Sequence, residues 1–327
     1  MIYAETGSTD PAFNLAFEQY ILENKPEGDW LMLWQNENTV VVGRNQLTAA
    51  EIDEDFVRAN NITVVRRMTG GGAVYHDLGN LNYSFITDLG NAAELSIERF
   101  ARPVCTALEK LGVQAELSGR NDILAEGKKV SGVAQRIYKD RILHHGTLFF
   151  DSKSDTIVAA LRPDPKKFTS KSAKSVRSRV GNIRELLPVD MSIDRFWQAI
   201  LQELSGEAYE RYEPTAEELS EIEKLADEKY RSWDWNFGHS PLYGFENSIR
   251  CPGGSLRVSM DVEGGVIKRL AFSGDYMALA GDEAVVAALV GLPHERGAVK
   301  KALGELGEAL CLSFGGIGAE EILSAMF

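Results

Sequence analysis

The sequence has few cysteines and no long apolar run. Cys105, Cys251 and Cys311 are far apart and form no Cys-x-x-Cys pair, so neither a disulfide framework nor a zinc site is indicated. A reducing compartment is the simplest interpretation, and no basic segment followed by an apolar core is present at the N-terminus. No apolar run reaches the length of a membrane span. We therefore expect a cytoplasmic protein that does not act at a membrane.

Positive charge is also scarce. The sequence has 35 Lys and Arg residues and 48 Asp and Glu residues, which gives a formal charge of −13. This balance argues against general binding of nucleic acid or anionic membranes, so any anion site must be a local positive patch. Two common phosphate motifs are missing as well, because the sequence has neither Gly-x-Gly-x-x-Gly nor a P-loop ending in Gly-Lys-Ser/Thr.

The most informative stretch that is present is residues 66–77, Arg-Arg-Met-Thr-Gly-Gly-Gly-Ala-Val-Tyr-His-Asp. It follows a short apolar run at 62–65 that predicts a buried strand. Three consecutive glycines let backbone N–H groups approach a ligand with no Cβ in the way, and the two arginines suit a phosphate or carboxylate. The alternative is a tight connection between strands with solvated arginines. The charged residues on both sides favour a ligand loop.

Residues 119–150 have the pattern of a β-meander with turns at 126–128 and 139–140. Polar residues gather where strands are usually apolar, namely Asn121, Asp122, Lys129, Ser131, His144, His145 and Thr147. Gly132 and Gly146 interrupt the strands, which often marks close approach of a ligand or another backbone. The polar residues 43–46, after another apolar strand, form either the mouth of a pocket or an ordinary loop.

A second basic segment spans residues 164–184. It has no acidic residue from 165 to 184, and its cations are Lys166, Lys167, Lys171, Lys174, Arg177, Arg179 and Arg184. It is either a solvated loop or a flap that recognises an anion and becomes ordered on binding. The acidity of the rest of the chain favours the flap.

Helices are expected at several positions along the chain. Asp10-Pro11 is a helix start, and Asn14 and Glu18 are expected on the solvated face of that helix. Further helices are predicted at 51–60, 94–111, 192–204 and 217–230, with Cys105 in the core. Near the C-terminus, a hairpin about Gly264-Gly265 and two or three short helices predict a small α+β unit.

Six short blocks together resemble the lipoate–protein ligases. These blocks are residues 42–46, 66–77, 119–122, 129–134, 145–148 and 175–180, in this order, and the resemblance covers nearly the whole length of the chain. The resemblance implies an α/β (α+β) fold. A biotin/lipoate-ligase-type catalytic domain with mixed β-sheets flanked by helices is expected at 1–245, and a small α+β accessory domain at 246–327.

The resemblance also implies a two-step reaction. Lipoate and ATP, with Mg²⁺, give lipoyl-AMP and pyrophosphate. The lipoyl group then passes to a lysine of a carrier domain, such as those of 2-oxo acid dehydrogenase E2 subunits or the glycine-cleavage H protein. Neither nucleic acid nor a membrane is an expected partner.

The family's functional residues fall on defined positions of this sequence. Lys129 matches the lysine that contacts both lipoate and the nucleotide phosphate, and it is the expected catalytic residue. The expected ATP and adenylate contacts are Arg67, Gly72, Ala73, Val74, Tyr75, Lys129, Lys174 and Arg177. The expected lipoate contacts are Gly70, Gly71, Lys129, Ala134 and His145, and Asp122 is the candidate for a metal-side residue. His76 and Asp77 are candidates for positioning the loop, and His145 for lining the pocket. A structural role is an equal alternative for each of the two histidines.

Three other functions compete with ligation. An octanoyl or lipoyl transferase of the same fold lacks an adenylation step, and those that work through a thioester need a cysteine in the active site. None of the three cysteines lies near the blocks of the meander. A biotin ligase is disfavoured because the sequence has no Gly-Arg-Gly-Arg run. The presence of Lys129, Arg67 and the basic flap argues against a non-catalytic lipoyl-domain binding protein.

Overall fold

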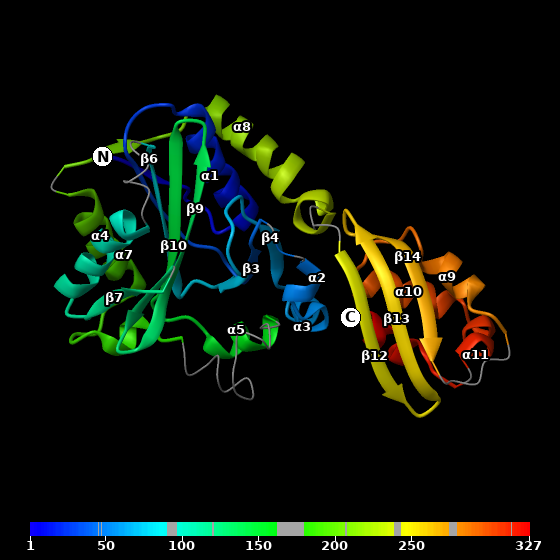
Figure 1. Cartoon of the computed structure of the whole chain (residues 1–327). Coiled ribbons are helices and arrows are strands. Elements are labelled where there is room, and N and C mark those ends of the chain that lie inside the picture. The colour runs from blue at the N-terminus through cyan, green and yellow to red at the C-terminus, as the bar shows by residue number, and fades with distance from the viewer. Residues whose placement is uncertain are drawn as a thin grey trace. The chain divides into compact units, whose positions relative to one another are not determined.

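The computed structural model describes residues 1–44, 46, 48–89, 97–119, 121–161, 180–206, 208–238, 243–274, 280–314 and 316–327. The chain divides into two compact units, which differ in size (Figure 1). The large unit comprises Met1–Arg44 and Ala59–Ser232, and the small unit comprises Asn45–Arg58 and Trp233–Phe327. The domain limits at residues 245 and 246 stay a prediction. None of the helices described is both long enough and apolar enough to span a membrane.

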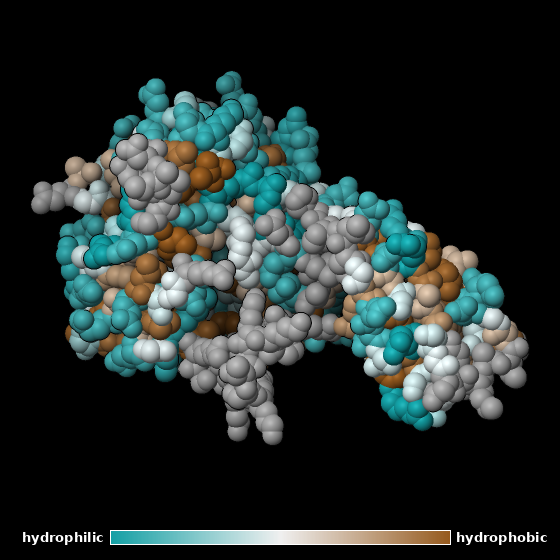
Figure 2. All heavy atoms as spheres, in the orientation of Figure 1, coloured by the Kyte–Doolittle hydropathy of each residue, from teal (hydrophilic) through white to brown (hydrophobic). Residues whose placement is uncertain are grey.

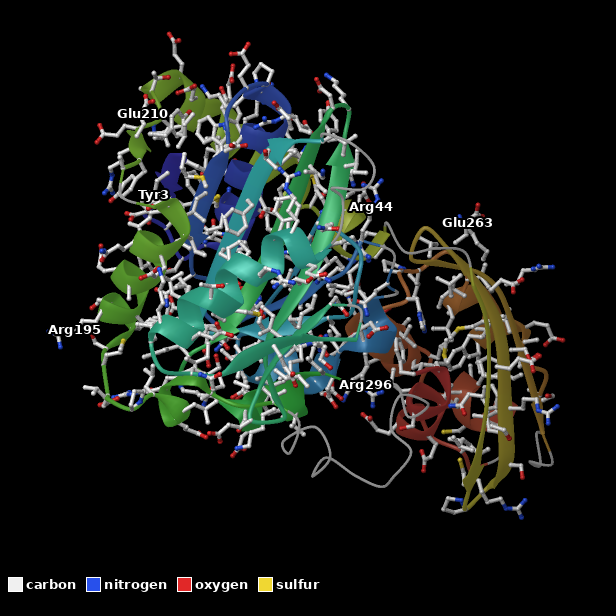
Figure 3. The ribbon with its side chains drawn as sticks, turned by 60° about the vertical axis from the view of Figure 1, so that its left-hand side comes forward. Tyr3, Arg44, Arg195, Glu210, Glu263 and Arg296 are labelled. Atoms are coloured by element: carbon white, nitrogen blue, oxygen red, sulfur yellow. The ribbon has the colours of Figure 1, made fainter. Side chains whose placement is uncertain are left out.

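The large unit is built on a mixed sheet with the strand order β11-β1-β2-β6-β10-β9-β8-β7. Its strands are β1 (Ile2–Glu5), β2 (Trp30–Trp34), β6 (Asn80–Asp88), β7 (Ala115–Ser118), β8 (Asp122–Ala125), β9 (Lys128–Tyr138), β10 (Arg141–Phe149) and β11 (Glu210–Tyr212). Strand β1 runs parallel to both β2 and β11, and the other pairs are antiparallel. Figure 3 labels Tyr3 and Glu210 on the adjacent strands β1 and β11.

A second, three-stranded sheet of the large unit carries the arginine and glycine stretch. It has the order β4-β3-β5 and consists of β3 (Thr39–Val42), β4 (Thr63–Arg66) and β5 (Val74–His76). Strand β3 pairs parallel with β4 and antiparallel with β5. The glycines therefore connect the end of β4 to the start of β5.

The predicted β-meander is confirmed as strands β8, β9 and β10. Its turns contain residues with positive φ, at Glu126 (50°), Gly127 (74°) and Lys139 (52°). Two successive residues with positive φ are typical of the tight turns whose twist matches that of antiparallel strands. The turn residues therefore set the register of these strands, and the register decides which side chains share a face.

Helices cover the large sheet on both faces. They are α1 (Pro11–Asn24), α4 (Ile97–Lys110), α5 (Ser154–Ala160), α7 (Ile193–Ser205), α8 (Ala216–Leu225), the 3₁₀-helix at Ile183–Leu186 and the π-helix at Ala226–Tyr230. In Figure 1, α4 and α7 lie on the opposite side of the long strands from α1 and α8. Cys105 is buried on α4, as predicted, and Gly112 follows this helix with a φ of +88°.

Helix α1 begins as predicted but corrects one expectation. The side chain of Asp10 accepts a hydrogen bond from the Ala12 N–H at 3.0 Å and caps the helix. Asn14 and Glu18 were expected on a solvated face, and both are buried. The reason is that α1 packs against the sheet strands on one side and against α8 on the other, so it has no wide solvated face.

The small unit is an α+β structure, as predicted. Its antiparallel sheet has the order β12-β13-β14, with β12 (Tyr243–Cys251), β13 (Gly254–Glu263) and β14 (Val266–Gly274). The hairpin turn at Gly264 and Gly265 is confirmed, with φ of +57° and +72°. In the described part of the chain four helices follow the sheet, where two or three were predicted, namely α9 (Glu283–Leu289), α10 (Arg296–Glu305), α11 (Glu308–Phe314) and α12 (Ala319–Met326). A π-helix precedes the sheet at Asp234–Gly238.

The small unit also takes in an early segment of the chain. The single helix predicted at 51–60 is two short helices, α2 (Thr48–Glu51) and α3 (Glu54–Ala59), because the Asp53 carboxylate accepts the Phe56 N–H and starts a new helix. Arg296, labelled in Figure 3, donates to Asp55 at 2.8 Å. Figure 2 shows hydrophilic side chains over much of the visible surface of both units, with smaller apolar patches between them.

Candidate active site

A pocket in the large unit brings together residues from α1, the three-stranded sheet and strands β2, β6, β9 and β10. Its apolar wall is formed by Leu15, Trp34, Val41, Val133 and Ala134. Its polar lining residues are Arg67, His76, Asn82, Asn121, Lys129, His145 and Thr147, with Gly72, Ala73, Val74, Gly132 and Gly146 beside them. A concave, largely apolar wall with a few converging polar groups is the usual form of a small-molecule site.

Most of the predicted site residues line this pocket, namely Arg67, Gly72, Ala73, Val74, Lys129, Ala134 and His145. Gly70, Gly71 and Asp122 are neighbours of lining residues and do not line it themselves. Tyr75 does not line the pocket either, and its buried side chain donates to Asn38 Oδ1 at 2.9 Å. Lys174 and Arg177, with residues 164–179 of the expected flap, lie outside the described residues. Arg184, at the end of the expected flap, is described, and it pairs with Asp151 and Asp190 at 2.7 Å each.

Lys129 lies at the start of β9 and forms an ion pair with Asp122, with 2.7 Å between Nζ and Oδ1. The two side chains are 28% and 38% exposed, so solvent screens this pair and it contributes little to stability. A Cβ on Gly132 would lie 3.0 Å from Lys129 Nζ. A Cβ on Gly146 would likewise meet the Tyr83 hydroxyl, at 2.5 Å. The close approach predicted at these glycines is therefore made by side chains.

Arg67 shapes the glycine loop, which we define as residues 69–74. Its Nη2 donates to the carbonyl oxygens of Gly70 at 2.6 Å and Gly72 at 2.9 Å. Its Nη1 donates to Val41 O at 3.1 Å, and its Nε donates to Thr69 Oγ1 at 3.0 Å. Burial lowers the pKa of Arg67 to about 10, which leaves it charged at neutral pH.

Arg66 has a different task from its neighbour. Its side chain is fully buried, and its Nη1 donates to the carbonyl oxygens of Gly43 at 2.9 Å and Arg44 at 3.0 Å. Arg44 N donates in turn to Thr69 O at 2.8 Å. Arg66 therefore ties the end of β3 to the glycine loop without lining the pocket. The described residues of 43–46 do not line the pocket either.

His145 lines the pocket and belongs to a buried hydrogen-bond network. Its Nε2 is 2.7 Å from Thr69 Oγ1, and its Nδ1 is 2.9 Å from Glu18 Oε1. The same Glu18 oxygen accepts from Ser84 Oγ at 2.6 Å, and Ser84 Oγ accepts from Trp34 Nε1 at 2.9 Å. Two pocket-lining side chains are therefore held by the Glu18 carboxylate, His145 directly and Trp34 through Ser84.

The pair His76-Asp77 is held by the protein itself. Asp77 accepts from the backbone N–H groups of Gly79 at 3.0 Å and Lys153 at 2.8 Å, which makes it a structural residue. His76 Nδ1 is 3.1 Å from Asn36 Nδ2, and burial lowers the pKa of His76 to about 3. This histidine is therefore neutral at neutral pH. The nearby positive charge of Arg67 also lowers the pKa of His76.

Sequence reasoning missed several residues of the site. Asn82 lines the pocket and was not singled out, whereas Thr147 was singled out only as a polar residue of the meander. The apolar residues Leu15, Trp34 and Val41 form the pocket wall. A signal for Asn82 was present, because three polar residues (Asn80, Asn82 and Ser84) alternate with apolar ones on β6. Glu18 also had a signal, since a carboxylate within a mostly apolar helix needs a buried partner or a solvated face.

Two family models match the chain. The lipoyl protein ligase A/B catalytic domain matches residues 10–205, and the bacterial lipoate protein ligase C-terminus matches residues 240–326. The chain belongs to the lipoate–protein ligase family. Lipoate–protein ligase 1 of Staphylococcus aureus is 41% identical over 320 residues, which is 97% of each chain.

Solved structures of this family have the same fold. The bipartite lipoate protein ligase of Thermoplasma acidophilum, described together with its E2 lipoyl domain, is 30% identical with a TM-score of 0.65. The match covers 73% of this chain and 96% of that one. A lipoate–protein ligase A bound with ATP is 28% identical with a TM-score of 0.60, over 73% of this chain and 97% of the other. These likenesses confirm the predicted lipoate-ligase fold.

Proposed function

We propose that this lipoate–protein ligase uses the pocket for both half-reactions. ATP activates lipoate to lipoyl-AMP with release of pyrophosphate, and the lipoyl group then passes to a lysine of a carrier domain. The observation that carries the assignment is that Lys129, Gly72 to Val74 of the glycine loop and a set of apolar side chains line one pocket. The family membership and the ATP-bound relative support the same reaction.

The first half-reaction brings two anions together. A lipoate carboxylate oxygen attacks the α-phosphorus of ATP, and the bond to the pyrophosphate oxygen breaks. The Lys129 ammonium lowers the repulsion between carboxylate and phosphate and stabilises the charge that develops in the transition state. The backbone N–H groups of the glycine loop supply donors for phosphate or adenine, and the wall formed by Trp34, Val133 and its neighbours suits an apolar acyl chain.

Mg²⁺ is proposed as a companion of ATP. No cluster of three or more His, Cys, Asp or Glu side chains suited to a metal occurs among the residues that the structure describes. This fits Mg²⁺, which is commonly bound through one or two carboxylates plus substrate phosphates. Asp122, half-exposed beside Lys129, is the proposed metal-side carboxylate. A Mg²⁺ ion held there would neutralise charge on the departing pyrophosphate.

The second half-reaction sets the partner. The carrier lysine amine attacks the lipoyl-AMP carbonyl carbon and AMP leaves. The Thermoplasma acidophilum ligase is described with an E2 lipoyl domain, and we propose 2-oxo acid dehydrogenase E2 domains and the glycine-cleavage H protein as acceptors. Lys174 and Arg177 are proposed adenylate contacts. We further propose a cytoplasmic location, with the three cysteines as free thiols.

Lipoate-dependent exchange between ATP and labelled pyrophosphate tests the first half-reaction. It is measured with Mg²⁺ and no carrier, and exchange is the expected result. Without exchange, but with transfer from added lipoyl-AMP, the protein is the alternative, a lipoyl or octanoyl transferase with no adenylation step of its own. A transferase that works through a thioester needs a cysteine in the active site. Cys105 is buried in the core, and neither Cys251 nor Cys311 lines the pocket.

A further inference from the structure

Two buried side-chain nitrogen atoms of the pocket lining have no hydrogen-bond partner. They are Asn82 Nδ2 and His76 Nε2, and neither has a partner among the residues that the structure describes. Asn82 is 1% exposed and His76 is 3% exposed. Leaving a buried polar group unpaired is costly, so such groups in native proteins usually meet a ligand or a water molecule. Because both side chains line the pocket, a bound substrate can reach them.

The hydrogen on the His76 ring is fixed by the residues on its other side. Asn14 Nδ2 donates to Asn36 Oδ1 at 3.0 Å, which orients the Asn36 amide. Asn36 Nδ2 therefore donates to His76 Nδ1, at 3.1 Å, and Nδ1 carries no hydrogen. The ring is neutral because burial lowers its pKa to about 3. Its single N–H is therefore on Nε2, the nitrogen without an acceptor.

The Asn82 amide is oriented by its neighbour on the same strand. Asn80 Nδ2 donates to Asn82 Oδ1 at 2.9 Å, so the oxygen of Asn82 already has a partner within the protein. The two hydrogens on Nδ2 remain for a ligand. The pocket therefore offers donors from two strands, the His76 N–H from β5 and the Asn82 amide from β6.

Asn82 lies two strands away from the Lys129 ammonium across the large sheet. Lys129 Nζ lies close to Gly132, whose N–H donates to Thr147 Oγ1 at 3.1 Å. Thr147 is paired with Asn82, and Asn82 is paired with Trp34 on the next strand. Paired residues of antiparallel strands share a face, so Thr147, Asn82 and Trp34 form one row. Two strand spacings place Asn82 about 10 Å from Gly132.

This separation is comparable with the length of lipoate. When the carboxylate is at Lys129, an extended lipoyl chain along the row brings its dithiolane ring to Asn82. His76 lies at the same end of the row, because its ring centroid is 6.3 Å from that of Trp34. The only hydrogen-bond acceptors of the lipoyl chain beyond its carboxylate are the two sulfur atoms of the dithiolane ring. Sulfur is a weak acceptor, but it can accept an N–H where carbon cannot.

We propose that Asn82 Nδ2–H and His76 Nε2–H donate to the dithiolane sulfur atoms and make the pocket prefer lipoate to an acyl chain of carbon alone. This proposal rests on the use of the pocket for lipoate proposed above. Any acyl chain that enters the pocket displaces solvent from these two donors. A lipoyl chain gives them an acceptor again, whereas octanoate leaves both unpaired. A site built to hydrogen-bond its substrate rejects an analogue that lacks the bonding atom.

The binding of lipoate and of a carbon isostere tests the proposal. The isostere is 5-cyclopentylpentanoate, which has nearly the shape of lipoate and carbon in place of both sulfur atoms. The dissociation constants of both acids are measured by calorimetry on the whole protein without ATP. We expect the wild type to bind lipoate about tenfold more tightly than the isostere. Equal affinities, or no binding of lipoate, overturn the proposal.

Asn82→Leu removes the amide and nearly keeps the size of the side chain. The preference for lipoate over the isostere is expected to fall to about threefold or less, because only lipoate loses a donor. Val41→Ala is the matched control, since it changes the apolar wall of the same pocket and no donor. It should weaken the binding of both acids alike and leave the ratio of the two dissociation constants unchanged. A wild-type ratio in Asn82→Leu overturns the role of Asn82.

His76→Phe provides a second variant if Asn82→Leu does not fold. It keeps a ring at the position and removes the Nε2–H, so the ratio of the two dissociation constants is expected to fall in the same way. Circular dichroism checks that each variant is folded. A damaged fold weakens the binding of both acids, whereas a lost sulfur contact weakens that of lipoate alone. An unchanged ratio in His76→Phe overturns the role of His76.

The exchange assay separates this proposal from the adenylating function. With lipoate and the isostere as alternative acids, the values of kcat/KM should show the same preference as the dissociation constants. A protein that binds lipoate more tightly than the isostere and catalyses no exchange refutes the adenylating function and leaves the sulfur contacts standing. A protein that activates both acids equally refutes the sulfur contacts and leaves the adenylating function standing.

Discussion

The two cations of the pocket have opposite surroundings. Lys129 is partly exposed, and its ion pair with Asp122 is screened by solvent. Arg67 is buried, and it uses four N–H groups on Thr69 and on backbone carbonyl oxygens. A flexible lysine in a screened ion pair can follow charge as it moves during a reaction, whereas an arginine with four of its five N–H groups on protein acceptors holds a shape. The comparison separates a cation for chemistry from a cation for architecture.

Replacing the lysine should give the largest change in activity. Lys129→Ala is expected to lower the exchange rate by about 10²–10³-fold, the usual cost of losing one group that stabilises transition-state charge. The free energy of unfolding should change by less than about 1 kcal/mol, because the ion pair is exposed. Lys128→Ala, on the same strand and outside the pocket lining, is the matched control. Exchange near the wild-type rate in Lys129→Ala removes Lys129 from the mechanism.

Replacing the arginine should change stability most. Arg67→Ala leaves the carbonyl oxygens of Val41, Gly70 and Gly72 without their donor and leaves Glu18 as a buried charge without its opposite. We expect the free energy of unfolding in urea to fall by about 3 kcal/mol. The exchange rate per folded molecule should fall as well, through the ATP KM. A variant that is as stable as wild type shows that Arg67 is not the architectural cation.

The strands around Lys129 could be predicted from the sequence because the patterns that indicate them are local. The turns at Glu126, Gly127 and Lys139 are marked by residue type and define the meander, and Lys129 follows the first turn at once. The glycine triplet likewise needs no distant partner to be recognised. The resemblance to a known family then assigned roles to these blocks.

The surroundings of Arg67 could be predicted only in part, because the residues that meet there are distant from one another in the sequence. Glu18 and His145 are separated by 127 positions, and no local pattern indicates that they meet. The charge of Glu18 suggested a solvated face, although α8 and the sheet cover α1 from both sides. For the same reason the sequence did not show that Asn45–Arg58 belongs to the small unit.

Two glycines of the triplet offer a finer test of the architectural side. Gly71 has a φ of +93°, and a Cβ there would lie 2.9 Å from Arg67 Nη2, whose movement is restrained by its hydrogen bonds. We expect Gly71→Ala to destabilise the fold by about 1–2 kcal/mol. Gly70→Ala is the control, because nothing lies within 4 Å of its Cβ position. Equal melting temperatures for the two variants contradict this account of the loop.

The smallest expected effect concerns pH and His76. Burial lowers the pKa of His76 from 6.5 to about 3, so the unfolded chain takes up a proton near pH 6.5 that the folded protein does not. The stability that comes from the neutral ring is therefore complete above pH 6.5 and is lost as the pH falls toward 3. Between pH 6.5 and 5.5 the loss is about 1 kcal/mol.

His76→Phe removes this proton uptake and keeps a ring at the position. The unfolding free energies of the variant and the wild type are measured in urea at pH 6.5 and pH 5.5. Relative to wild type, the variant should be more stable at pH 5.5 than at pH 6.5 by about 1 kcal/mol. A parallel pH dependence in the two proteins means that another group carries it. Lys129→Ala should leave the pH dependence unchanged, because its partly exposed ion pair is screened by solvent. The buried His76 would then account for the loss of stability in acid, and the partly exposed Lys129 for catalysis.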